Sequence, residues 1–105
     1  MKTYYYYFRN AQKAPLVTVC LMTGESEFVR GIAVCSPLDI VSKAIGRGLA
    51  RGKALRALGT RSNSSPIKRT IVSEIREEVG FPKTWKYKSE YMPELSSFER
   101  KLVEK

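Results

Sequence analysis

Two apolar, β-branched runs on either side of a short turn constrain the fold of this chain more than any other feature. Residues 16–22 read LVTVCLM and residues 27–35 read EFVRGIAVC, with the tetrapeptide TGES between them. Two such runs around a glycine-containing turn predict a β-hairpin. A turn centred on the Gly-Glu pair would place Cys20 opposite Val29.

An aromatic segment precedes this hairpin. Residues 3–9 read TYYYYFR, and a β-strand places successive side chains on opposite faces. One face then carries Tyr4, Tyr6 and Phe8, and the other carries Tyr5, Tyr7 and Arg9. Because aromatic residues favour strands, we expect a three-stranded antiparallel meander over residues 3–35.

Serine-proline pairs mark the first two expected helix starts. Serine is a favoured N-cap and proline is favoured at the first helical position, so helices are predicted over residues 37–58 and 66–79. A glycine follows each of them, Gly59 and Gly80 respectively. Glycine suits the left-handed residue that follows many helices.

The last part of the chain completes an α+β pattern. A Met-Pro pair opens a helix predicted over residues 93–104, and residues 83–91 alternate aromatic and lysine side chains, which suits either a short edge strand or a loop. The order β-β-β-α-α-(β)-α predicts an α+β fold in which the meander packs against two to three helices. A chain of 105 residues has the length of one domain, so we expect residues 1–105 to form a single domain.

Positive charge is concentrated in the middle of the chain. The whole sequence has 19 Lys and Arg against 10 Asp and Glu, a net charge of +9. Residues 37–70 contain eight basic residues and a single acid, Asp39. A concentrated positive field attracts polyanions whatever the fold beneath it.

The helix predicted over residues 37–58 separates an apolar side from a basic ridge. The apolar side carries Leu38, Val41, Ile45 and Leu49, together with Gly48 and Gly52. The basic ridge on the opposite side carries Lys43, Arg47 and Arg51. We expect the apolar side and its two glycines to pack closely on the sheet, and the ridge to face solvent.

The sequence offers little for catalysis. It contains no histidine, which removes the usual neutral-pH base and His-based metal sites. Glu74 and Glu78 are best explained as a solvated helix face. Cys20 and Cys35 lie in apolar strands, where free cysteine behaves as a small hydrophobe, so we expect core thiols in a reducing compartment. We expect no enzyme activity, no metal and no cofactor.

We expect the basic middle of the chain to bind nucleic acid through phosphate contacts. The candidate contact residues are Lys43, Arg47, Arg51, Lys53, Arg56, Arg61, Lys68 and Arg69. The aromatic residues that could stack on bases are Tyr5, Tyr7, Trp85 and Tyr87. The pattern does not choose between DNA and RNA.

A second class of function stays open. A basic ridge can also occupy an acidic protein surface, which would make the chain a non-enzymatic inhibitor or modulator of a host factor. A homo-oligomer is compatible with both functions. No apolar run approaches the roughly 18–20 residues of a membrane span, so no membrane partner is expected.

Three stretches carry a likeness to known sequences. They are GIAVCSPLD at residues 31–39, SKAIGR at residues 42–47 and GKAL at residues 52–55. In these stretches, within residues 31–58, the chain resembles small uncharacterised proteins of bacteriophages and prophages. The resemblance implies a cytoplasmic setting in a bacterial host cell, and it implies no activity.

Overall fold

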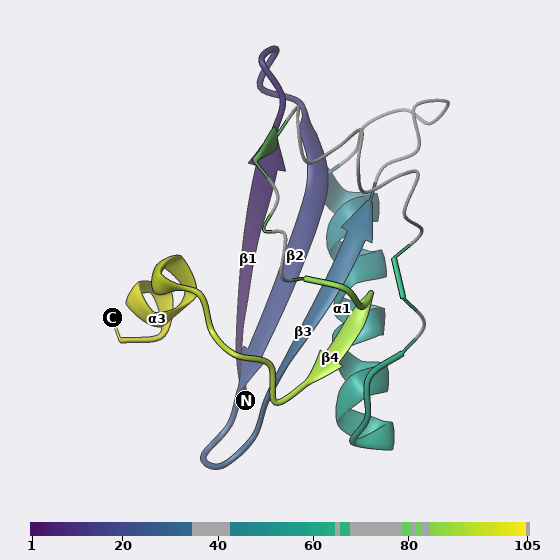
Figure 1. Cartoon of the computed structure of the whole chain (residues 1–105), viewed down its shortest axis with the longest axis vertical. Coiled ribbons are helices and arrows are strands. Elements are labelled where there is room, and N and C mark those ends of the chain that lie inside the picture. Colours follow the sequence, from purple (N-terminus) through teal and green to yellow (C-terminus); the bar gives the residue numbers. More distant parts are fainter. Residues whose placement is uncertain (35–42, 65, 68–78, 81, 83–84, 105) are drawn as a thin grey trace.

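The computed structural model describes residues 1–34, 43–64, 66–67, 79–80, 82 and 85–104 (Figure 1). Within these residues, four strands form one antiparallel sheet in the order β1-β2-β3-β4. The elements are β1 (Lys2–Arg9), β2 (Pro15–Thr23), β3 (Phe28–Val34), α1 (Lys43–Thr60), β4 (Ser89–Tyr91) and α3 (Ser97–Glu104). The α+β fold and the meander of β1, β2 and β3 are confirmed, and β4 extends the predicted sheet to four strands.

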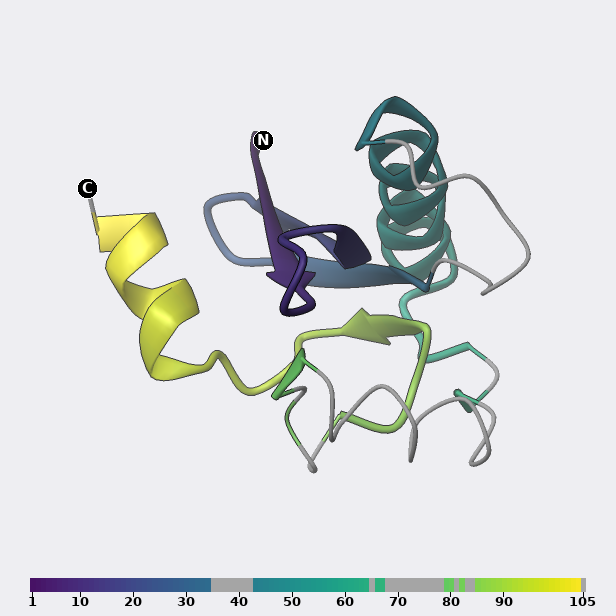
Figure 2. The same ribbon diagram turned by 90° about the horizontal axis from the view of Figure 1, so that it is seen from above.

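Helices α1 and α3 lie on opposite sides of the sheet. Helix α1 covers the face formed mainly by β3 and β2, and Figure 2 shows it on one side of the sheet with α3 lying beyond β1. Helix α3 reaches the other face through side chains, because Phe98 contacts Tyr6 and Glu99 binds Arg30. Both faces of the sheet are therefore covered in part by helix.

The hairpin between β2 and β3 turns one residue later in the chain than the sequence predicts. Gly24 donates its N–H to the carbonyl oxygen of Glu27 at 2.7 Å, which closes a four-residue connection between Thr23 and Phe28. Cys20 consequently pairs with Gly31. The expected pairing of Cys20 with Val29 is wrong by two residues. The shift matters because Gly31 is where α1 crosses the sheet.

Residues 88–91 pair with β3 on the side away from β2. Among the described residues 85–91, only Ser89–Tyr91 forms a strand. The segment predicted as either a strand or a loop over 83–91 therefore contains a short strand. Upstream of it, Tyr87 forms a bridge with Pro66 and the Ile67 N–H donates to the Lys86 carbonyl oxygen at 2.8 Å. The prediction that a helix starts at Pro66 is therefore wrong for Pro66 and Ile67, because these two residues pair with Tyr87 and Lys86.

The rest of the second predicted helix lies mostly outside the described residues. Residues 68–78 are not described, whereas Val79 is helical and Gly80 has a φ of 70°. A positive φ is the left-handed conformation expected of a glycine that follows a helix.

Helix α1 extends beyond its predicted end. It runs to Thr60 with Gly59 inside it, and the left-handed residue is Arg61, with a φ of 51°. Thr60 Oγ1 donates to the Arg56 carbonyl oxygen at 2.9 Å and so satisfies a carbonyl near the helix end. The predicted end at residue 58, with Gly59 as the following residue, is wrong. The predicted start over residues 37–42 lies outside the described residues.

Helix α3 begins at Ser97, so the predicted start at residue 93 is wrong. Ser96 is the N-cap, since its Oγ accepts the Glu99 N–H at 3.2 Å and the Glu99 carboxylate accepts the Ser96 N–H at 3.0 Å. This reciprocal pair is a capping box. The pattern Ser96-Ser97-Phe98-Glu99 is its sequence signal, and it outweighs the proline at Pro93.

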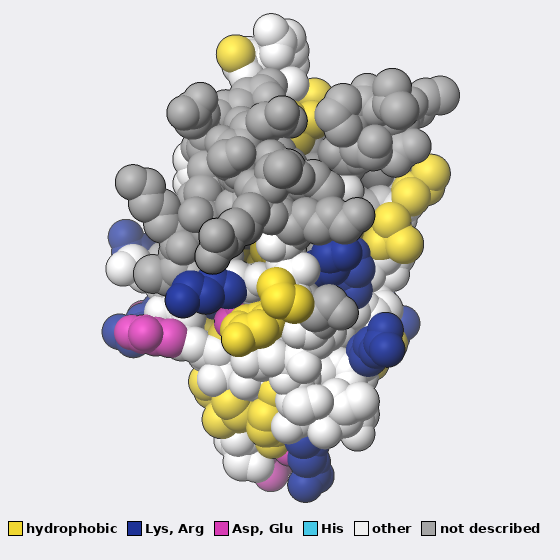
Figure 3. All heavy atoms as spheres, turned by 45° about the vertical axis from the view of Figure 1, so that its right-hand side comes forward, with side chains coloured by type: hydrophobic (Ala, Val, Ile, Leu, Met, Phe, Trp, Pro, Cys, Tyr) yellow, Lys and Arg dark blue, Asp and Glu magenta, His cyan; other side chains and the backbone are white. Residues whose placement is uncertain are grey.

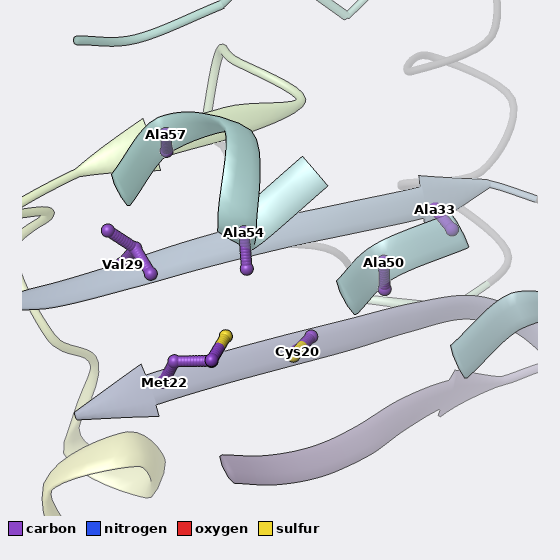
Figure 4. Packing of buried hydrophobic residues seen from close by; sticks show 7 residues of the cluster. All are labelled: Cys20, Met22, Val29, Ala33, Ala50, Ala54 and Ala57. Carbon is purple, nitrogen blue, oxygen red and sulfur yellow. The ribbon is translucent and has the colours of Figure 1, made fainter. Parts of the chain in front are cut away.

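Helix α1 packs on the sheet through alanines. Figure 4 shows Ala50, Ala54 and Ala57 directed at the side chains of β2 and β3. The cluster contains Cys20, Met22, Val29, Ala33, Ala50, Ala54 and Ala57. Burial raises the pKa of the Cys20 thiol to about 11, so the thiol is neutral and unreactive at neutral pH. The core-thiol prediction is confirmed for Cys20, and Cys35 lies outside the described residues.

The predicted inward face of the helix is wrong. Ile45 is 64% exposed and Leu49 is 55% exposed, and a Cβ built on Gly48 or Gly52 would meet no atom within 4 Å. The reason lies in the sheet. A Cβ on Gly31 would overlap the Ala50 carbonyl oxygen and lie 2.5 Å from the Ala54 amide nitrogen. The close approach occurs, but the glycines that permit it are Gly31 of β3 and Gly46 of α1, where a Cβ would overlap Thr18 Oγ1.

The other face of the sheet has an aromatic core. It consists of Tyr6, Val17, Val19, Ile32, Ile67 and Trp85, with Phe8, Val34, Val79 and Leu102 packed at its edge. Tyr6 and Phe8 each meet the Trp85 ring edge to face, an arrangement that aromatic pairs favour. The alternation predicted for β1 is confirmed, because Tyr6 faces this core while Tyr5 packs on the α1 side.

Candidate nucleic-acid interface

The rotation of α1 brings its basic ridge beside β1. With the alanines facing the sheet, Lys43, Arg47 and Arg51 follow the flank of the helix next to β1. Arg47 Nη1 donates to the Tyr7 hydroxyl at 3.1 Å, and Lys43 Nζ lies 5.3 Å from the centre of the Tyr7 ring. The predicted ridge and the predicted tyrosine face therefore meet along one line.

Arg9 of β1 adds a fourth cation. Its guanidinium carbon lies 5.1 Å from the centre of the Tyr7 ring, and its Nη1 donates to the Lys13 carbonyl oxygen at 3.0 Å. We define the Tyr7 strip as Arg9, Lys43, Arg47 and Arg51 with Tyr5 and Tyr7. Cations over an aromatic ring are held by its quadrupole, so Tyr7 orients three of the four charges.

Tyr5 supports the Arg51 end of the strip. Burial raises the pKa of Tyr5, the nearby Cys20 raises it further, and the Arg51 and Arg47 charges oppose both effects. Tyr5 is therefore neutral at physiological pH and cancels none of the Arg51 charge.

The positive charge of the strip is not compensated within the described residues. Glu27 pairs with Arg61 at 3.3 Å, and Glu90 and Glu99 both pair with Arg30. In the described part of the chain, no carboxylate lies within ion-pair distance of the four cations. Successive ridge residues are four apart, which spaces their Cα atoms by about 6 Å along the helix axis. The strip can therefore contact several negative groups of an extended polyanion.

The remaining predicted contact residues do not join the strip. Lys53 lies on the flank toward β4, where burial lowers its pKa and the Lys88 charge lowers it further. Arg56 is exposed, and Arg61 is paired with Glu27. Lys68 and Arg69 lie outside the described residues. On the face shown in Figure 3, Lys and Arg side chains form separate clusters with apolar and uncharged side chains between them.

Two of the four predicted stacking residues lie away from the strip. Trp85 is only 5% exposed, and the Arg30 guanidinium carbon lies 4.1 Å from the centre of its ring. The prediction that a base stacks on Trp85 is therefore wrong for this fold, because the Trp85 ring is buried in the core. Tyr87 is half-buried in the bridge to Pro66, on the β4 side of the sheet.

A buried ion pair that was not among the predicted site residues anchors α3. Arg30 is 1% exposed and Glu99 is fully buried. Arg30 donates from Nε to Glu99 Oε2 at 2.9 Å and from Nη2 to Glu99 Oε1 and to the Glu94 carbonyl oxygen. The visible signal was an arginine in the middle of the apolar run of β3, because a buried charge requires a partner.

Acid should weaken this pair. Burial by itself would raise the pKa of Glu99, but hydrogen bonds and charge from Arg30 outweigh it and hold the pKa below its usual value. The stabilisation is then complete above the unfolded pKa of about 4.3 and is lost as pH falls through the lower folded value. We expect the Glu99→Gln variant to lose less stability than the wild type below about pH 4.

Chemical denaturation at a series of pH values would test this expectation. Burial raises the pKa of Glu90, so Glu90 changes the stability with pH in the opposite direction to Glu99. Both proteins contain Glu90, and the stability of the variant is therefore compared with that of the wild type at each pH. Parallel pH profiles for wild type and variant would contradict the assignment.

The described residues offer neither a metal site nor a membrane-spanning helix. No three acidic or cysteine side chains among them gather closely enough to hold a metal ion. None of the helices in the described part combines the length and the apolar content needed to cross a bilayer.

The fold and the strip define the chain as an α+β protein with one helix over an antiparallel sheet and a cationic flank. Comparison with protein-family models, with curated protein sequences and with solved structures finds no match to this chain. The resemblance to bacteriophage proteins therefore stays a prediction.

Proposed function

We propose that this chain is a non-enzymatic protein that binds the phosphate backbone of nucleic acid along the Tyr7 strip. One observation carries the proposal: four cations from β1 and α1 line a single flank without a neighbouring carboxylate in the described residues. Phosphate contacts supply affinity and position but do not read sequence.

Tyr7 has a positioning role in this proposal. Its hydroxyl accepts a hydrogen bond from Arg47, and its ring lies against Arg9 and Lys43. Arg9 and Lys43 therefore take up the space beside the Tyr7 ring in which a base would have to stack. Binding should therefore depend on salt more than on base identity.

We expect affinity to fall steeply with salt. Four neutralised phosphates predict a loss of about 50-fold for a single strand and about 150-fold for duplex DNA between about 50 and 200 mM salt. Fluorescence anisotropy with labelled single-stranded DNA, single-stranded RNA and duplex DNA measures this loss. Absence of binding at low salt, or binding independent of salt, would overturn the proposal.

A double variant locates the contact. Arg47→Gln with Arg51→Gln removes two of the four cations, so the slope of log affinity against log salt should fall by about half. The matched control is Arg100→Gln with Lys101→Gln, which removes the same charge from the exposed surface of α3. Equal slopes for the two double variants would place the binding surface elsewhere.

A further inference from the structure

Helix α1 turns large apolar side chains away from the sheet. Ile45 and Leu49 are more than half exposed, and Leu55 is 38% exposed. We define the outer face of α1 as Ile45, Gly48, Leu49, Gly52 and Leu55. Single exposed apolar residues are ordinary, but a group on one helix face is typical of an interaction surface.

Two glycines lie within this outer face. Gly48 and Gly52 are one helical turn apart, and a Cβ at either position would meet no atom within 4 Å. Each costs the helix about 1 kcal/mol relative to alanine, and sheet packing does not require either one, since alanines fill that side. Without side chains at these positions, another helix can approach the α1 backbone closely.

The charged side chains that α1 itself contributes are all of one sign. Helix α1 contains five basic residues and no acid over Lys43–Thr60. Arg51 and Arg56 are both exposed on α1. A second copy of α1 would bring like charges together, which opposes association. An acidic partner would instead find complementary charge beside an apolar centre.

We propose that the outer face of α1 docks an amphipathic helix of a partner protein whose apolar stripe is bordered by Asp and Glu. Leu49 and Leu55 bind the stripe, Gly48 and Gly52 allow close approach, and Arg51 and Arg56 pair with the bordering acids. This is the helix-against-helix mode of recognition. Arg51 also belongs to the Tyr7 strip, but the apolar residues of the outer face do not, and phosphates offer nothing to exposed leucines.

The test uses three synthetic helical peptides. The first has a leucine stripe bordered by glutamates, the second replaces the glutamates by lysines, and the third replaces the leucines by serines. Titration into isotope-labelled protein, followed by NMR, should perturb the Leu49, Gly52 and Leu55 amides with the first peptide only. Affinity for either of the other two should be at least about tenfold weaker.

Variants of exposed apolar residues test which of them bind the peptide. Leu49→Ser with Leu55→Ser should weaken the glutamate peptide by at least about tenfold and leave the salt slope for nucleic acid unchanged. The control, Phe98→Ser, removes an exposed apolar residue of α3 and should leave peptide affinity unchanged. Melting temperatures verify that each variant folds.

Three outcomes would overturn the docking proposal. One is equal affinity for the glutamate and lysine peptides, and another is unchanged affinity in the leucine double variant. The third is a dimer in sedimentation experiments that Leu49→Ser abolishes, which would make a second copy the occupant. Failure of the nucleic-acid titrations leaves this test intact, because the two experiments use different ligands and different variants.

Discussion

Replacing Arg30 by methionine is expected to lower the free energy of unfolding by about 3–5 kcal/mol, because it leaves a buried carboxylate without its partner. Glu99 is fully buried and accepts two hydrogen bonds from the Arg30 guanidinium. Glu90 lies 3.4 Å from the same guanidinium and would also lose its ion pair. Thermal melts should show a fall of roughly 15–30 °C for a domain of this size.

Two further variants separate the buried charge from other effects. Adding Glu99→Gln to Arg30→Met removes the buried charge and keeps a residue that can complete the capping box, so the double variant should be more stable than Arg30→Met alone. Arg61→Met breaks the exposed pair with Glu27 and should cost less than about 1 kcal/mol. Equal losses for Arg30→Met and Arg61→Met would show that the buried pair contributes no more than a surface pair.

Replacing Gly31 by alanine should be the most damaging single-methyl change in the described chain. The new Cβ would overlap the Ala50 carbonyl oxygen and crowd the Ala54 amide nitrogen. Both are helix backbone atoms that cannot rotate away, so the cost should reach the upper end of overpacking, about 3 kcal/mol. This corresponds to a fall in melting temperature of roughly 10–25 °C.

The same substitution at Gly48 is the matched control. The position lies within α1 and faces open space, so Gly48→Ala should raise stability by about 1 kcal/mol, or roughly 4–8 °C. Opposite signs for the two substitutions would confirm which glycine faces the packed interface. A neutral Gly31→Ala would mean that α1 does not cross β3 at that residue.

The candidate site shows where sequence reasoning succeeds and where it stops. Lys43, Arg47 and Arg51 are spaced four residues apart, and this spacing alone places them along one side of a helix. The sequence therefore grouped them correctly. The alternation of Tyr5 and Tyr7 is likewise a property of an extended strand. That the two groups meet could not be predicted, because it depends on where α1 crosses the sheet.

Trp85 shows the opposite failure. An aromatic residue between lysines reads equally well as an exposed stacking residue or as an edge of the core. Its burial depends on Arg30 and Tyr6, which lie far from it in the sequence. Only the tertiary structure brings these three side chains together.

The sequence by itself determined the elements whose signals are local. The periodicity of side chains specified β1, β2 and β3 and the helical character of α1, because strand and helix repeats follow from backbone geometry. It could not determine which side of α1 faces inward, since alanines occupy one side and Ile45, Leu49 and Leu55 another, and both are apolar. The tertiary structure decided this, because the four-residue turn sets the β2–β3 register and places Gly31 beneath the helix. Because Gly31 has no side chain, the alanine side of α1 can reach the sheet there, while the larger apolar residues remain on the surface.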